Sequence, residues 1–227
     1  GREVDSLKQF RLALAEDPGN AETLLEKAKV EARTLDFETA LSDLSQAAAS
    51  DPKSEVAIEI AQLHAKLLLR SRQTEAATKV LGDLLSRFGD DQRLVEDVVE
   101  LQVEEGQYES ALSTLEDLIG KTTDPYQKVM RQLRKGDVLQ LSGKREEALS
   151  QYAATLSQSG RESWLEREIL AQIEQLFVRE DNIEGLVTFY EGLLEKEPQR
   201  LALNKAVSGL KLQLGDVDGA LEQFGRV

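Results

Sequence analysis

The sequence predicts an all-α protein, a solenoid of stacked antiparallel helix pairs, and three observations support this prediction. Leu, Ala, Glu, Gln, Lys and Arg dominate the 227 residues, and these residues favour helices. Aromatic residues make up only 5% of the chain and there are 4 prolines, which argues against an all-β sandwich or barrel. A short phrase also recurs about every 35 residues, and a period of this length is typical of helical repeat arrays.

The repeated phrase consists of a turn residue, often an aromatic residue, then a small residue followed by an apolar one. Clear copies occupy residues 35–41, 106–112, 143–149 and 215–221, and weaker copies occupy 71–77 and 181–187. The small residue serves as the anchor of each copy. The anchors are Ser6, Ala40, Ala76, Ala111, Ala148, Leu186 and Ala220. Successive anchors lie 34, 36, 35, 37, 38 and 34 residues apart, so the period is regular.

Each repeat is predicted to contain two helices, because apolar residues return at helical spacing both before and after the anchor. The first helices are expected near 21–34, 54–70, 91–105, 125–142, 162–179 and 199–214. The second helices are expected near 3–16, 37–49, 73–87, 108–119, 145–158, 182–195 and 217–226. Isolated helices of this length are marginal in water, so each hairpin must bury its apolar face against the next one.

Prolines and glycines agree with this division into helices. All four prolines fall between a second helix and the next first helix, while Gly106, Gly143 and Gly215 fall at the turn inside a hairpin, where a positive φ is common. We therefore expect residues 1–227 to form a single superhelical array of about six repeats, with partial repeats at both ends. The partial repeats and the start at Gly1 predict a piece of a longer protein.

The composition argues against several classes of function. Lys and Arg number 28 against 42 Asp and Glu, which gives a net charge of −14. Nucleic acids and anionic membranes are both bound through basic residues, so we expect neither as a partner. There is no cysteine, which removes disulfides, thiolate nucleophiles and Cys-containing zinc sites. No run of 18 apolar residues is present. The compartment stays open, with the cytoplasm as the expectation.

These residues resemble the tetratricopeptide repeat (TPR) over almost the whole chain. The family's early small residue is matched by Ala28, Gly136 and Ser208, and its hairpin turn by Gly106 and Tyr108. Its later aromatic residue and its proline are matched by Phe10, Tyr152, Tyr190, Phe224, Pro18, Pro52 and Pro198. Departures from the pattern are His64, Val99 and Glu174 at the small position and Leu186 at the anchor, so the repeats at Ala76 and Leu186 are predicted to be degenerate. The resemblance implies a right-handed superhelix.

The resemblance also implies a concave groove lined by first helices, which binds a peptide or protein segment. Positions 15, 11 and 7 before each anchor share one broad helix face. The candidate groove residues on this face are Lys29, Arg33, Ala61, Ala65, Leu69, Glu96, Glu100, Glu104, Asp137, Gln175 and Arg179. An apolar triplet of Ala61, Ala65 and Leu69 thus neighbours an acidic triplet, which predicts a partner with an apolar stretch beside basic residues. The alternative is a solvated acidic face.

Charge is distributed in blocks along the chain. Residues 90–117 hold ten acidic residues and one basic residue, whereas residues 121–145 hold seven basic residues and two acidic ones. Adjacent repeats of opposite sign are expected to pair with each other. The set of Lys and Asn residues with which some family members hold a C-terminal carboxylate is missing from the groove positions, which argues against that mode of binding.

No catalytic, cofactor or metal site is predicted. Gly120-Lys121-Thr122 lacks the earlier glycine of a phosphate-binding loop, and Asp216-Val217-Asp218-Gly219 lacks the ligand spacing of a calcium loop. His64, the only histidine, is interpreted as a packed core residue at the small-residue position. Trp164 is interpreted as a packing residue, with a partner contact as the alternative. We expect no enzyme.

The leading hypothesis is therefore a scaffold for protein–protein interaction, whose partner the sequence does not identify. One alternative is a regulatory or substrate-docking arm of a larger enzyme. Another is self-association through the solenoid ends, because open ends expose apolar surface unless they are capped. RNA recognition by a helical repeat would require a basic groove, and the acidic triplet opposes it.

Overall fold

The computed structural model describes residues 2–50, 52–161 and 163–225, and these residues form thirteen α-helices and no strand. The helices are α1 (Arg2–Glu16), α2 (Ala21–Arg33), α3 (Phe37–Ala49), α4 (Ser54–Arg70), α5 (Thr74–Phe88), α6 (Gln92–Glu104), α7 (Tyr108–Lys121), α8 (Pro125–Leu141), α9 (Arg145–Gln158), α10 (Trp164–Val178), α11 (Ile183–Lys196), α12 (Leu201–Gln213) and α13 (Val217–Phe224). None of these helices is long and apolar enough to cross a lipid bilayer.

The all-α prediction is confirmed, and every described helix end lies within two residues of its predicted position. The predicted bounds at 162 and 226 lie outside the described residues. Helical periodicity was sufficient to predict where the helices lie, because each helix buries one apolar stripe against its neighbours.

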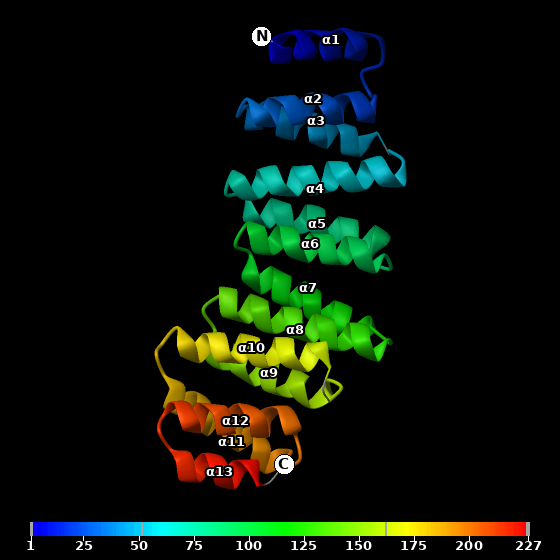
Figure 1. The fold of residues 1–227 in the computed structure, drawn as a ribbon. Helices are drawn as coiled ribbons and strands as arrows, with labels where there is room; N and C mark the ends of the chain where they lie inside the picture. The colour runs from blue at the N-terminus through cyan, green and yellow to red at the C-terminus, as the bar shows by residue number, and fades with distance from the viewer. Residues whose placement is uncertain (1, 51, 162, 226–227) are drawn as a thin grey trace. The chain divides into compact units, whose positions relative to one another are not determined.

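The chain divides into two compact units, Gly1–Thr114 and Leu115–Val227. Consecutive helices pack side by side from α1 to α6 in the first unit and from α8 to α13 in the second, as Figure 1 shows for α2, α3 and α4. First helices also touch the first helices of the next repeat: α2 contacts α4, α4 contacts α6, and α8 contacts α10. Each unit is therefore a stack of helices in which first helices of successive repeats also touch one another.

The turn inside each hairpin has one geometry, and it sets the register of the repeat. The predicted turn glycines adopt positive φ, with values of 72° at Gly106, 80° at Gly143 and 83° at Gly215. The equivalent residues in the other three hairpins are Leu35, Arg72 and Asp181, which adopt positive φ without being glycine. In all six, the next residue donates its backbone N–H to a carbonyl five residues earlier, which is the bond of a Schellman motif.

The anchor always follows the positive-φ residue by five positions, and this corrects one predicted anchor. Five positions after Arg72 is Ala77, which is fully buried, whereas the predicted anchor Ala76 is exposed. The backbone N–H of Ala77 donates to Gln73 O at 3.1 Å, as the other anchors do to the residue before their helix. The small residue twelve positions earlier is then Ala65, also fully buried, and not His64. This repeat is regular, so the prediction that it is degenerate was wrong.

The small residue of the first helix and the residue four positions after the anchor pack against each other between the two helices of a repeat. In the repeat of α8 and α9, a methyl group added at Gly136 would collide with the Tyr152 ring, so glycine at this position is needed to admit the tyrosine. The hydroxyl of the fully buried Tyr152 donates to Asp137 Oδ1 at 2.8 Å. In the repeat of α2 and α3 the smaller Leu44 fills this space beside Ala28.

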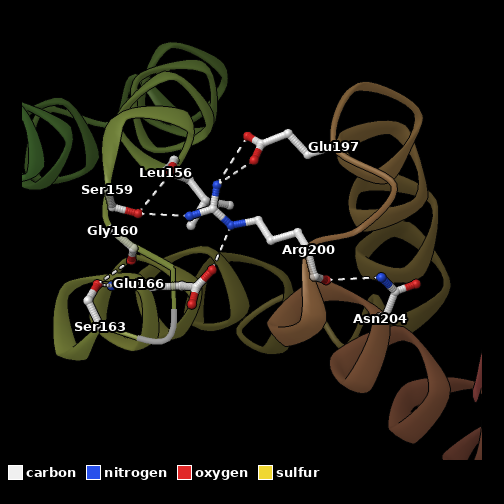
Figure 2. Close-up of polar contacts among 8 residues, drawn as sticks. All are labelled: Leu156, Ser159, Gly160, Ser163, Glu166, Glu197, Arg200 and Asn204. Atoms are coloured by element: carbon white, nitrogen blue, oxygen red, sulfur yellow. Dashed lines mark hydrogen bonds and ion pairs between the residues drawn. The ribbon is translucent and has the colours of Figure 1, made fainter. Parts of the chain in front are cut away.

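Each unit also buries charged side chains. In the first unit, Lys27 of α2 pairs with Glu31 at 2.6 Å and with Asp43 of α3. In the second, Arg200 precedes α12 and donates to Glu166 of α10, to Glu197 after α11 and to Ser159 after α9 (Figure 2). Arg200 and Glu166 are each only 1% exposed. These contacts join the ends of four helices in three successive repeats.

Candidate functional site

A groove crosses the first helices of the first unit. Its lining comes from α2, α4 and α6 alone, which are the helices that the repeat pattern places on one face. The lining residues are Lys29, Glu59, Gln62, Leu63, Lys66, Asp97, Glu100, Leu101 and Glu104. The groove therefore combines two leucines with a rim of charged side chains.

The groove carries more negative than positive charge. Two lysines, Lys29 and Lys66, face four carboxylates among the lining residues. Lys29 Nζ lies 2.6 Å from Glu59 Oε1, and Lys66 Nζ lies 3.5 Å from Glu104 Oε2. Partial burial lowers the pKa of Lys29, but its hydrogen bonds to Glu26 and Glu59 outweigh burial and raise the pKa overall. Lys29 is therefore charged at neutral pH, and the formal charges of the two lysines and four carboxylates give the groove a net charge of −2.

The corrected register moves the predicted apolar triplet off this groove. Ala65 is fully buried in the core between α4, α5 and α6, and Leu69 packs against the same core. Ala61 lines a separate pocket beside α5. Counting back 15 and 11 positions from Ala77 gives Gln62 and Lys66, and both line the groove. The apolar part of the groove is instead supplied by Leu63 and Leu101.

The other predicted groove residues divide between the two units. Lys29, Glu100 and Glu104 line the groove of the first unit. Arg33 and Glu96 are exposed on the same helices, α2 and α6, but outside the lining. The remaining three lie in the second unit: Gln175 and Arg179 are exposed, whereas Asp137 is half-buried and accepts the Tyr152 hydrogen bond. Asp137 therefore serves packing in this structure.

Sequence reasoning missed Glu59, Gln62, Leu63 and Lys66 on α4, and also Asp97 and Leu101 on α6. The one-residue error in the anchor rotated α4 by about 100° in the predicted arrangement, whereas Asp97 and Leu101 each lie one residue beyond a predicted position on α6. The correct register follows from the positive φ of the turn residue Arg72. The sequence does not reveal this φ, because residues other than glycine rarely adopt positive values.

The structure modifies the expectation for Trp164 and shows one ion pair of the kind expected between the charge blocks. Trp164 is 46% exposed and meets Tyr126 edge to face, with ring centroids 6.4 Å apart, so it is not a fully packed residue. The blocks of opposite charge pair at Lys135 and Glu116, 2.6 Å apart.

Comparison with known proteins agrees with this geometry. Residues 95–176 match the family model described as a tetratricopeptide repeat-like domain. Two solved structures share the fold. The C-terminal part of a TPR repeat-containing protein from Cytophaga hutchinsonii matches with a TM-score of 0.53 at 14% identity, over 99% of this chain and 89% of that chain. A chain in a structure of Naa15/Naa10 bound to HypK-THB matches with a TM-score of 0.52 at 17% identity, over 99% of this chain and 36% of that chain.

No curated protein matches the sequence. The family match, the hairpin geometry and the structural neighbours define a helical repeat protein, which is the class predicted from the sequence. Its repeats are tetratricopeptide-like. This fold is consistent with a scaffold for protein interaction.

Proposed function

We propose that the chain is a non-catalytic scaffold whose groove on α2, α4 and α6 binds an extended segment of another protein. The observation that carries this proposal is the lining itself, where Leu63 and Leu101 lie among carboxylates. Stacked repeats present extended surfaces of this kind, and they bind partners by combining apolar contact with complementary charge.

The partner segment is basic, with at least one apolar side chain. Its Lys or Arg residues pair with Asp97, Glu100 and Glu104, while its apolar side chain covers Leu63 and Leu101. Lys29 and Lys66 set the position of the segment, because a basic residue placed beside either lysine is repelled. The sequence predicted the same kind of partner, but the apolar contacts come from Leu63 and Leu101 instead of Ala61, Ala65 and Leu69.

The test uses a display library of random ten-residue peptides selected against the purified chain. We expect enrichment of peptides that contain Lys or Arg beside Leu, Ile or Phe. The variant Glu100→Lys/Glu104→Lys is expected to weaken the best peptide about tenfold, since exposed charge pairs contribute up to ~1 kcal/mol each. The weakening is expected to shrink at high salt.

The matched control is Glu168→Lys/Glu195→Lys, which makes the same change of charge on exposed residues of the second unit. We expect it to leave peptide affinity within about twofold of the unmodified chain. Equal loss in both variants would show that net charge, and not the groove, governs binding. Selection of acidic or purely apolar peptides would also contradict the proposal.

A further inference from the structure

A second hollow in the first unit lies on the side of the second helices, away from the groove. Its residues on α4 are Ala57, Ile60, Ala61 and His64, whereas the groove uses Glu59, Gln62, Leu63 and Lys66. The two sets are offset by two residues, which is about 200° around a helix, so they occupy opposite faces of α4. The pocket is therefore independent of the groove.

The walls of this pocket are mostly apolar. They come from α3, α4 and α5 and include Ala48, Ala57, Ile60, Val80, Leu84 and Phe88. The alanines on α3 and α4 leave space that larger side chains would fill, and the volume is about 340 Å³. A pocket of this size and lining is typical of a site for a small apolar group, with specificity supplied by a few polar atoms.

His64 brings an imidazole to this apolar pocket. The structure records no hydrogen bond or ion pair for this imidazole among the described residues. Burial lowers the pKa of His64, so the ring is neutral at pH 7. A neutral imidazole offers one acceptor nitrogen and one N–H donor. The expectation that His64 is a packed core residue is corrected by this position, since the side chain is only partly buried.

The rim of the pocket carries one charge of each sign. Asp83 and Arg87 of α5 both line it, and the Arg87 guanidinium lies over the Phe88 ring, 5.2 Å from the centroid. Opposite charges at the rim give no preference for a charged ligand, whereas the apolar walls favour a ring or an alkyl group.

We infer that this pocket binds a phenolic group, an aromatic ring that carries a single hydroxyl. The ring lies against Ile60, Leu84 and Phe88, and the hydroxyl donates to the acceptor nitrogen of the neutral His64 imidazole. A hydroxyl satisfies the imidazole without bringing a charge out of water, which a carboxylate or an ammonium would have to do. Two sources share this chemistry, a free small phenol and the tyrosine side chain of a protein.

The experiment follows the only imidazole of the chain by NMR while p-cresol is added. Because the sequence has one histidine, its Cε1–H signal needs no assignment. We expect a saturable shift of this signal, and binding of 4-methylanisole that is roughly fivefold weaker, since its methyl ether cannot donate the hydrogen bond. A signal that stays in place up to the solubility limit of p-cresol would overturn the inference, as would equal binding of the two compounds.

Variants and a second pair of ligands complete the test. Ala61→Leu fills the pocket and is expected to abolish the shift, while the matched control Ala154→Leu, at an exposed position of the second unit, is expected to retain it. Circular dichroism establishes that both variants are folded, and the comparison of p-cresol with 4-methylanisole needs no variant. Tighter binding of N-acetyl-tyrosinamide than of N-acetyl-phenylalaninamide assigns the site to protein tyrosines, and binding of p-cresol alone assigns it to a free phenol. A shift that persists in Ala61→Leu would contradict the pocket.

Discussion

The two units bury charge in different ways. In the second unit, Arg200 uses Nε and both terminal nitrogens of its guanidinium, and these bond Glu166, Glu197 and Ser159. In the first unit, Glu31 shares Lys27 with Asp43, and its Oε2 atom is buried without a partner among the described residues. Both clusters lie between neighbouring helices, yet one satisfies its polar atoms and the other leaves a carboxylate oxygen unbonded.

This difference teaches that a repeat stack tolerates buried charge when every polar atom can reach a partner. Arg200 can bond several partners because its planar group presents five donors, and the ends of α9, α10 and α11 bring acceptors to it. A single lysine between two carboxylates cannot do the same. The first cluster is therefore expected to respond to pH, and the second to the loss of either ion-pair partner.

The largest effect is expected from Arg200→Met. It removes the buried ion pair to the Glu166 carboxylate, and breaking a buried pair by removing one partner costs about 3–5 kcal/mol of unfolding free energy. The double variant Arg200→Met/Glu166→Leu is expected to lose less, because it removes the buried carboxylate together with the guanidinium.

Urea unfolding measures both changes, with Arg167→Met as the control at an exposed position of the same unit. The control is expected to stay within about 0.5 kcal/mol of the unmodified chain. If the single and the double variant lost equal stability, the ion pair would not be the cause.

A smaller, pH-dependent effect is expected at Glu31. Burial raises its pKa and the nearby Asp43 raises it further, while Lys27 opposes the rise; the net shift is upward from 4.5. The folded state therefore holds this proton more tightly than the unfolded state does, and stability falls as pH rises from the ordinary pKa of glutamate through the raised one. Glutamine does not titrate, so Glu31→Gln is expected to gain stability relative to the unmodified chain across that window.

Urea unfolding at a series of pH values between about 4 and 7 tests this expectation. The free energy of Glu31→Gln minus that of the unmodified chain is expected to increase with pH and then level off. A difference that decreased with pH would mean that Lys27 dominates and that the pKa of Glu31 is lowered.

The sequence predicted the helices well because helical periodicity and the proline positions are local signals. Gly106, Gly143 and Gly215 marked three hairpin turns correctly because positive φ favours glycine. The anchor was predicted at Ala76 instead of Ala77 because the two adjacent alanines fit the repeated phrase equally well. The turn residue Arg72 gave no signal, since it adopts a positive φ without being glycine. The groove residues of α4 were missed together with the anchor, although Lys29, Glu100 and Glu104 were predicted.

The buried charges were not predictable from local patterns. Charged residues on amphipathic helices are expected at the surface, so nothing in the sequence distinguishes Glu31 or Glu166 from exposed glutamates. Glu166 and Arg200 meet because stacking brings residues 34 positions apart together. That separation equals one repeat, and it becomes informative only after the stacking is known.

The register of the repeat in α4 and α5 determines both sites of the first unit, because it aligns Lys66 with the groove and His64 with the pocket. The direct test compares Ala77→Leu with Ala76→Leu by urea unfolding. Overpacking at the fully buried Ala77 is expected to cost about 1–3 kcal/mol, whereas leucine at the exposed Ala76 is expected to change stability by less than about 0.5 kcal/mol. The reverse order would contradict the account and restore the register in which Ala76 is the anchor.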